Sequence, residues 1–171
     1  CGEETALLNS LEGKRGEPRL KPPYFHAVMG LYNKPTLVNN VETISSVPWI
    51  IQNSGKEYSK LGVEGSTGTR IFSLSGHVNN PGNFEIEMGQ SFGEFIDTFG
   101  KGIKNNKNVK AYIPGGASAP WFTGDQLDIK MTIDDVANAG SMLGSGAVVV
   151  MDEDTNLVYA AKSIVSFFAH E

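Results

Sequence analysis

The stretch RIFSLSGHVNNPGNFEIEMGQSFGEFIDTFG, residues 70–100, decides the fold of this chain. Apolar and polar residues alternate along residues 70–78 and again after the turn sequence Asn-Asn-Pro-Gly at 79–82, which is the two-residue period of half-buried β-strands. Ser91 and Glu94 then have the spacing of a helical capping box ahead of a run of apolar residues. The stretch therefore predicts a β-hairpin followed by a helix that packs against it.

Downstream of this hairpin, the pattern predicts more elements of the same domain. Residues 109–113 and the more apolar residues 147–151 read as strands, and a short helix is expected near residues 132–137. A hairpin, a helix across it and further strands in one sheet are the outline of a β-grasp, or ubiquitin-like, fold. Upstream, residues 53–69 are rich in Gly, Ser, Lys and Thr, which is typical of a connection between domains.

The N-terminal part predicts two helices separated by a basic loop. Residues 4–12 have leucines on one face and acids in the first turn, as expected of a short helix. Residues 14–35 combine prolines and glycines with five basic residues, a composition that suits an anionic ligand. Asn39 or Asn40 can cap the second helix, in which Pro48 predicts a kink or a fresh start.

Composition places the chain among ordinary soluble globular proteins. Hydrophobic residues make up 40% and charged residues 19%, which argues against disorder and fibrous repeats. A net charge of -5 without blocks of like charge gives no indication of binding to nucleic acid or an anionic membrane. No apolar run approaches the roughly 20 residues of a membrane span. The single cysteine excludes an internal disulfide framework and fits a reducing compartment.

Several motifs closely resemble the flavin subunit of respiratory complex I. They are CGEETALLNSLEG at 1–13, RLKPPY at 19–24, VNNVET at 38–43, SGHV at 75–78, GGAS at 115–118 and FFAHE at 167–171. In that family the last motif runs on into the cysteines that ligate a four-iron cluster, and those ligands are absent from this chain. Because the chain also begins at Cys1 without an initiator methionine, we interpret both ends as cuts in a longer protein.

The resemblance implies a fold class of α/β and α+β, with parts of three domains. Residues 1–68 would be the C-terminal part of a Rossmann-like domain that binds FMN and NADH. Residues 69–153 would form a ubiquitin-like β-grasp domain of the soluble-ligand-binding (SLBB) type. Residues 154–171 would be the first helix of the helical bundle that carries the iron-sulfur cluster. One departure from the family pattern is Tyr24-Phe25-His26-Ala27, where the family more often has an aromatic residue, then Pro and Ala.

The resemblance also implies cofactor-binding residues. It implies no catalytic residue and no metal ligand in this chain. Those expected at FMN are Gly2, Glu3, Glu4, Asn39, Asn40 and Thr43, and those expected at the adenine half of NADH are Lys21 and Tyr24. Each assignment has a plainer alternative. The acids of the first turn can simply complement the helix dipole, the asparagines can simply cap a helix, and Lys21 can be a solvated side chain beside a packing tyrosine.

The implied function is that of an NADH:quinone oxidoreductase subunit, which takes hydride from NADH onto FMN and passes electrons to iron-sulfur clusters. The cofactors of the full-length protein would be FMN, NAD and a 4Fe-4S cluster, and its partner would be the thioredoxin-like 2Fe-2S subunit. The protein is expected to lie peripherally on the cytoplasmic side of the inner membrane, without inserting into it. Nucleic acid is not an expected partner. This piece alone is expected to be inactive. Alternatives are the flavin subunit of an NAD-linked hydrogenase or formate dehydrogenase, and a β-grasp docking module.

Overall fold

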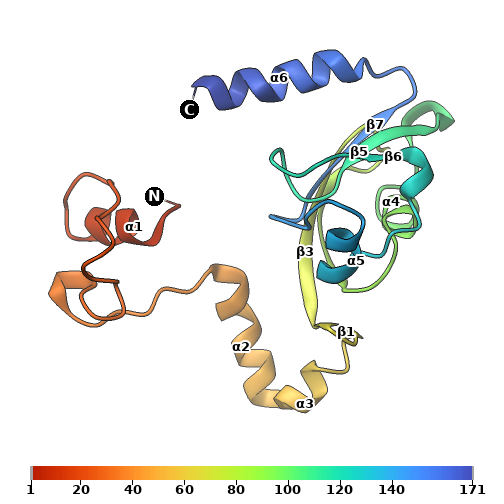
Figure 1. The fold of residues 1–171 in the computed structure, drawn as a ribbon. Helices are drawn as coiled ribbons and strands as arrows, with labels where there is room; N and C mark the ends of the chain where they lie inside the picture. The colour runs from red at the N-terminus through yellow and green to blue at the C-terminus, as the bar shows by residue number, and fades with distance from the viewer. Residues whose placement is uncertain (1, 171) are drawn as a thin grey trace. The chain divides into compact units, whose positions relative to one another are not determined.

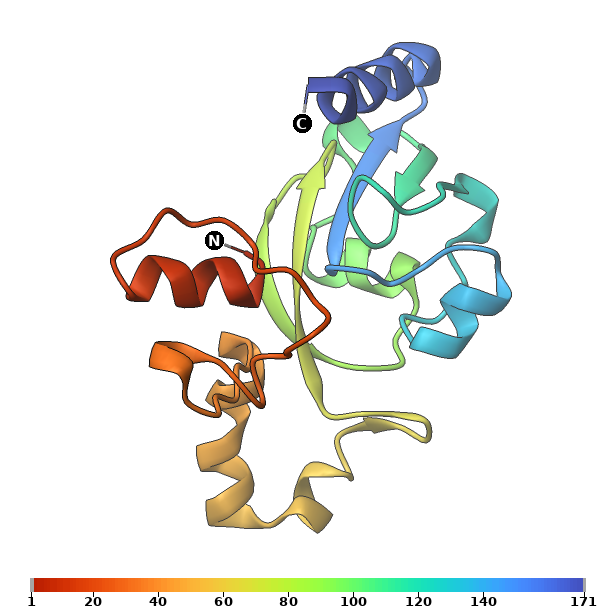
Figure 2. The same ribbon diagram turned by 60° about the vertical axis from the view of Figure 1, so that its left-hand side comes forward.

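The computed structural model describes residues 2–170, so Cys1 and Glu171, which open and close the motifs quoted above, lie outside it. Its ribbon is drawn in Figure 1 and, turned by 60°, in Figure 2. The chain forms two compact units, of which the first ends at Pro48 and the second begins at Trp49. The division falls inside helix α2, Val41–Asn53.

The first unit is built on helix α1, Glu4–Leu11, which confirms the helix predicted at this end of the chain. Glu3 has extended backbone angles and caps the helix with its side chain. Gly13 follows the helix in the left-handed region, with φ +76°. Leu8 is buried, whereas the other two leucines of α1 remain exposed. The loop that follows contains one short 3-10 helix, η1 Leu31–Asn33.

Between the loop and the main sheet, the structure has more order than the sequence predicted. Helix α2 continues through Pro48, so the proline does not start a new helix. After it come a one-turn helix, α3 Gly55–Tyr58, and an antiparallel pair of strands, β1 Gly62–Val63 and β2 Ser66–Thr67. The sequence predicted only a connection here, because strands of two residues are too short to show an alternating pattern.

A five-stranded sheet forms the centre of the second unit, with the strands in the order β4-β3-β7-β5-β6. The strands are β3 Thr69–Gly76, β4 Gly82–Glu87, β5 Val109–Ile113, β6 Phe122–Thr123 and β7 Ala147–Asp152. β3 runs parallel to β7, and the other neighbouring pairs are antiparallel. The predicted hairpin is confirmed as β3 and β4, and the two further predicted strands are β5 and β7.

Helices cover both faces of this sheet (Figures 1 and 2). They are α4 Phe92–Thr98, α5 Ile133–Asn138 and α6 Leu157–His170, with the 3-10 turns η2 Lys104–Asn106 and η3 Gly124–Gln126. Alternation along β7 separates two apolar clusters: Val148 and Val150 pack with residues of α4 and α5, whereas Met151 packs on the side of α6. The expected helix after the hairpin and the expected last helix are therefore α4 and α6.

The start of α4 confirms the predicted capping box. The Ser91 hydroxyl accepts from the Glu94 backbone N–H, and the Glu94 carboxylate accepts from the Ser91 backbone N–H. An N-cap of this kind stabilises a helix by about 1 kcal/mol. The second unit as a whole is a mixed α/β structure with an open mixed sheet. Across the described residues, every helix is too short or too polar to cross a bilayer.

Candidate functional site

The candidate site begins at the N-terminal end of α1, where Glu3 caps the helix. One carboxylate oxygen of Glu3, Oε2, accepts from the backbone N–H groups of Thr5 and Ala6, each at 2.9 Å, and from the Thr5 hydroxyl. The Thr5 hydroxyl, followed by the Lys21 ammonium, lowers the pKa of Glu3 from 4.5 to about 2. Glu3 is therefore held as a carboxylate with one oxygen committed to the cap.

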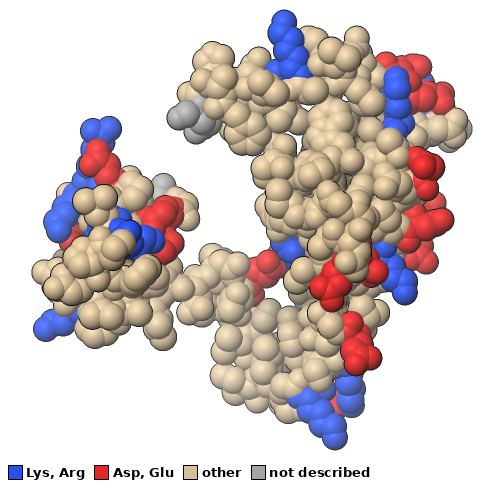
Figure 3. All heavy atoms as spheres, in the orientation of Figure 1, with Lys and Arg blue, Asp and Glu red and all other residues tan. Residues whose placement is uncertain are grey.

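Lys21 joins the two acids of the first turn. Its ammonium lies 2.9 Å from Glu3 Oε1 and 2.8 Å from Glu4 Oε1. The hydrogen bond from Lys21 lowers the pKa of the Glu4 carboxyl, and the bonds to Glu4 and Glu3 raise the pKa of Lys21. Figure 3 shows acidic and basic side chains next to one another on the visible face of the first unit. Three predicted site residues are thus brought together.

His26 lies against this cluster, although no motif in the sequence singled it out. Its Nδ1 atom is 3.7 Å from Glu4 Oε1. Among residues 2–170, this buried nitrogen has no hydrogen-bond partner. The one available signal was the departure from the family pattern at residues 24–27, which introduces a histidine between an aromatic residue and an alanine.

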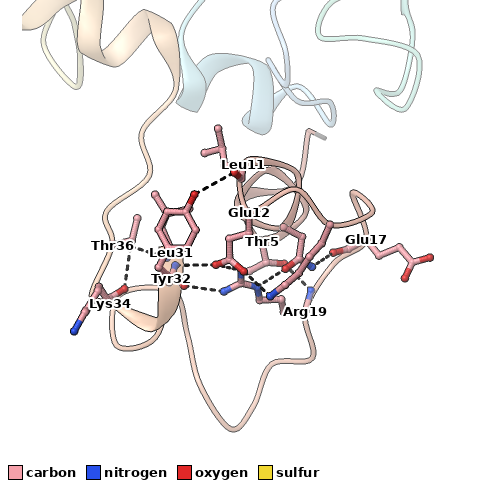
Figure 4. Close-up of polar contacts among 12 residues, drawn as sticks. Thr5, Leu11, Glu12, Glu17, Arg19, Leu31, Tyr32, Lys34 and Thr36 are labelled. Atoms are coloured by element: carbon pink, nitrogen blue, oxygen red, sulfur yellow. Dashed lines mark hydrogen bonds and ion pairs between the residues drawn. The ribbon is translucent and has the colours of Figure 1, made fainter.

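A second polar network ties the loop to α1 (Figure 4). The Arg19 guanidinium donates from Nε to Asn9 Oδ1 at 2.8 Å, from Nη1 to the Gly30 carbonyl at 2.9 Å and from Nη2 to Glu12 Oε1 at 2.8 Å. The backbone N–H of Arg19 donates to the Thr5 hydroxyl at 2.8 Å. Arg19 therefore fixes the loop at both ends of α1, close to the position from which Lys21 reaches the acids.

Glu12 is the carboxylate at the centre of this network, and its side chain is only 7% exposed. Besides Arg19, it accepts from the Tyr32 backbone N–H at 2.8 Å and from the Lys14 ammonium. The hydrogen bond from Lys14, then those from Arg19 and Tyr32, lower the pKa of Glu12 to about 2. Sequence reasoning assigned no role to Arg19, Thr5 or Glu12, although all three lie in the quoted motifs.

The remaining predicted residues lie on other segments. Tyr24 is 53% exposed, so its ring is accessible. Asn39, Asn40 and Thr43 are exposed at the start of α2, where Asn40 Oδ1 accepts from the Thr43 backbone N–H at 2.8 Å. Asn40 therefore does cap a helix, as the plainer alternative held. Space beside Gly2 is open, since a Cβ added there would meet no atom within 4 Å.

Sequence comparison finds extensive similarity to the F subunits of NADH-quinone oxidoreductases. No family model matches the chain. The F subunit of Rickettsia felis is 47% identical over 172 residues, which cover all of this chain and 40% of that protein. The F 2 subunit of Rhizobium meliloti is 48% identical, with 40% of it covered, and the F subunit of Mycobacterium bovis is 47% identical, with 38% covered. The chain thus spans about two fifths of the length of these curated relatives.

Comparison with solved structures also finds similarity to an NAD-linked redox enzyme. Two crystal structures of an NAD⁺-reducing [NiFe]-hydrogenase, one H₂-reduced and one air-oxidised, superpose on all of this chain with a TM-score of 0.82 and 33% identity. The matched parts are 28% and 29% of those hydrogenase chains. The mixed α/β architecture described above is therefore similar to part of a known NAD-linked redox enzyme.

Proposed function

We propose that this chain belongs to a flavin subunit that oxidises NADH. The premise is that the chain is homologous over its whole length to part of the NADH-quinone oxidoreductase F subunits. The full-length protein would take hydride from NADH onto FMN and pass electrons to iron-sulfur clusters. The observation that carries the proposal is the Lys21 ammonium between Glu3 and Glu4. Two separate motifs of the chain meet in this cluster at one polar, partly exposed surface.

The donor set of this cluster fits a nucleotide. An ammonium with three donors and two carboxylates can bond to the hydroxyl and amino groups of a ribose and a base. The exposed ring of Tyr24 offers an aromatic face three residues from Lys21. We assign Lys21 and Tyr24 to the adenine half of NADH, and Glu3 and Glu4 to the flavin and nicotinamide side of the same pocket.

FMN would be held by Gly2 and by the start of α2. Open space beside Gly2 allows a planar ring to approach the backbone. The N-terminal end of a helix attracts a phosphate through its backbone N–H groups and its dipole, and Asn39, Asn40 and Thr43 are exposed there. When bound, FMN supplies the chemistry of accepting a hydride and releasing electrons singly, while these residues bind and orient it.

The iron-sulfur chemistry would lie outside this chain. The chain contains one cysteine, so it cannot by itself supply the cysteine ligands of a four-iron cluster. We assign the 4Fe-4S cluster to the remainder of the full-length protein and the thioredoxin-like 2Fe-2S subunit to its partners. A place on the cytoplasmic face of the inner membrane, held through the complex, belongs to the same proposal.

The domain layout belongs to the same proposal. Residues 1–68 would complete an FMN- and NADH-binding Rossmann-like domain, and 154–171 would begin a helical bundle. Residues 69–153 would be a β-grasp domain of the SLBB type. The strand order β4-β3-β7-β5-β6, with parallel central strands and α4 packed on one face, supports this assignment.

A second candidate is the flavin subunit of an NAD-linked hydrogenase, which is favoured by the superposition at a TM-score of 0.82. Both candidates use the same pocket and differ in the electron acceptor. Purification of the full-length protein with its native partners distinguishes them. Co-purification of a [NiFe] subunit would support the hydrogenase, whereas co-purification of membrane subunits would support the quinone-linked enzyme.

The NADH site itself is tested by substitution in the full-length protein. Glu4→Gln and Lys21→Ala are expected to raise the KM for NADH or shift the flavin potential, measured with an artificial electron acceptor and by redox titration. If both variants keep the KM and the potential of the unsubstituted protein, the proposed site is wrong. The present chain alone should bind FMN weakly and oxidise no NADH, so a sub-micromolar Kd in a fluorescence titration would contradict the proposal.

A further inference from the structure

We propose that His26 is a positioning residue of the nucleotide site, whose Nδ1 donates a hydrogen bond to the Glu4 carboxylate when the Lys21 ammonium turns toward the bound nucleotide. The proposal rests on the proposed function, since it assumes that Lys21 is a nucleotide ligand. It concerns a residue at which this chain departs from the motif pattern quoted above.

The geometry brings two donors to one acceptor atom. Glu4 Oε1 accepts from the Lys21 ammonium at 2.8 Å, and the same oxygen lies 3.7 Å from His26 Nδ1. A carboxylate oxygen has two lone pairs and can accept more than one hydrogen bond. An N–H···O bond is formed at about 2.9 Å, so a rotation of the imidazole that moves Nδ1 by less than about 1 Å completes the contact.

The buried state of Nδ1 gives this contact a driving force. A buried polar atom without a partner is destabilising, so nearly all such atoms in folded proteins are paired. Among residues 2–170, the Nδ1 atom of His26 is the one buried side-chain nitrogen or oxygen without a hydrogen bond. The carboxylate of Glu4 is the acceptor that faces it. The unpaired Nδ1 of His26 near the Glu4 carboxylate indicates a second state of the site, in which His26 donates a hydrogen bond to Glu4.

Lys21 is able to leave Glu4, and its departure affects Glu4 more than Glu3. The lysine side chain is a flexible stem whose three donors are shared between the two acids. Glu3 keeps its bonds from Thr5 and Ala6 when Lys21 moves. Glu4 is left with the bond from its own backbone amide. His26 then supplies a replacement donor to Glu4, whose partly exposed carboxylate lies 3.7 Å from His26 Nδ1.

The backbone around His26 is fixed, so that rotation of its ring is the available movement. Its carbonyl oxygen accepts from the Thr36 backbone N–H at 3.0 Å. Thr36 Oγ1 in turn accepts from the Leu31 backbone N–H at 2.9 Å. Gly30 closes this turn, because a Cβ there would lie 2.4 Å from Thr36 Cβ and 2.7 Å from the His26 carbonyl. The turn holds the imidazole beside Glu4.

The test replaces His26 with Asn or Gln, whose side-chain amides place an N–H donor near different nitrogens of the original imidazole. In the full-length protein with its FMN, His26→Asn puts an N–H near the position of Nδ1, whereas His26→Gln puts it near Nε2. We expect His26→Gln to raise the KM for NADH roughly 5- to 10-fold, as for one lost hydrogen bond, with kcat changed less than about twofold. His26→Asn should restore the KM to within about twofold of the original value. Equal KM values for the two variants, or an unchanged KM in both, would overturn the proposal.

The double variant separates this proposal from the proposed function. With Glu4→Gln in place, His26→Gln should have little further effect on the KM, because the two side chains act on one contact. If Glu4→Gln raises the KM but His26→Gln does not, the role of His26 is wrong and the NADH site stands. If Glu4→Gln and Lys21→Ala also leave both the KM and the flavin potential unchanged, the NADH site is wrong as well. Circular dichroism identifies any variant that fails to fold, independently of its FMN content.

Discussion

The backbone N–H of Arg19 donates to the hydroxyl of Thr5 at 2.8 Å, although the two residues are fourteen positions apart in the sequence. That hydroxyl in turn donates to the carboxylate of Glu3. The loop that carries Lys21 and the helix end that carries the two acids are therefore joined by consecutive hydrogen bonds. Removing one of these hydrogen bonds should change the pKa of the acid that it reaches.

Thr5→Val should raise the pKa of Glu3. The substitution removes the hydroxyl, which is the largest cause of the depressed pKa, and keeps the shape of the side chain and the backbone N–H groups of the cap. The pKa should move from about 2 toward the ordinary value of 4.5. Titration of the Glu3 carboxyl carbon by NMR measures it. Thr5→Ser, which keeps the hydroxyl, is the matched control, and an identical pKa in all three proteins would contradict the prediction.

The first unit should lose stability in acid. Glu3 and Glu12 have pKa values of about 2 in the folded state, compared with 4.5 in the absence of structure. A carboxyl whose folded pKa is lowered stabilises the protein fully above its unfolded pKa, and this contribution is lost as the pH falls toward the folded pKa. Amide hydrogen exchange in α1 should accelerate, relative to the intrinsic rate, between about pH 4.5 and 2. Glu12→Gln should flatten this profile, and protection that is constant or rises toward low pH would argue against it.

Arg19→Lys should loosen the loop although the charge is kept. A lysine cannot donate simultaneously to Asn9, Gly30 and Glu12 in the directions that the planar guanidinium uses. The expected loss is about 1–3 kcal/mol of unfolding free energy, measured as faster amide exchange at Tyr32. Arg15→Lys is the control, because the Arg15 side chain is 87% exposed. Equal effects of the two substitutions would show that the network contributes nothing specific.

Phe95→Ala should destabilise the second unit strongly. Phe95 is buried on α4, and its ring packs against those of Phe72, Phe84 and Phe99. Deleting a buried phenylalanine ring costs about 3–5 kcal/mol. Urea unfolding of the chain, followed by circular dichroism, should show a lower midpoint. Val158→Ala, at an exposed position of α6, should change the midpoint little. A similar midpoint in the two variants would contradict the assigned core.

Much of the fold could be predicted because its patterns are local. The turn sequence at 79–82, the capping box at Ser91 and the short, mostly apolar runs of β5 and β7 each lie within one short window. The two-residue strands β1, β2 and β6 were missed because they carry no period. The parallel pairing of β3 with β7 joins residues about seventy positions apart, and no local pattern reports such a partner.

The candidate site also contains residues that could be predicted from the sequence and residues that could not. Glu3, Glu4 and Lys21 were expected because they lie in motifs that resemble a known family. The contacts of Arg19 and His26 depend on the path of the loop between residues 19 and 36, which is set by hydrogen bonds between distant backbone and side-chain atoms. Composition indicated only that this loop was basic. The loop path therefore had to be seen before these two residues could be assigned.

The position of β3 in the sheet has a consequence for synthesis of the protein. β3 is flanked by β4, which follows it at once, and by β7, which is the last strand of the chain. While the ribosome is still translating the residues before β7, helix α4 can already cover Phe72, but one edge of β3 remains unpaired. Such an edge is a template for pairing with another chain. We therefore expect the unpaired edge of β3 to be the aggregation-prone part of the nascent domain until β7 emerges.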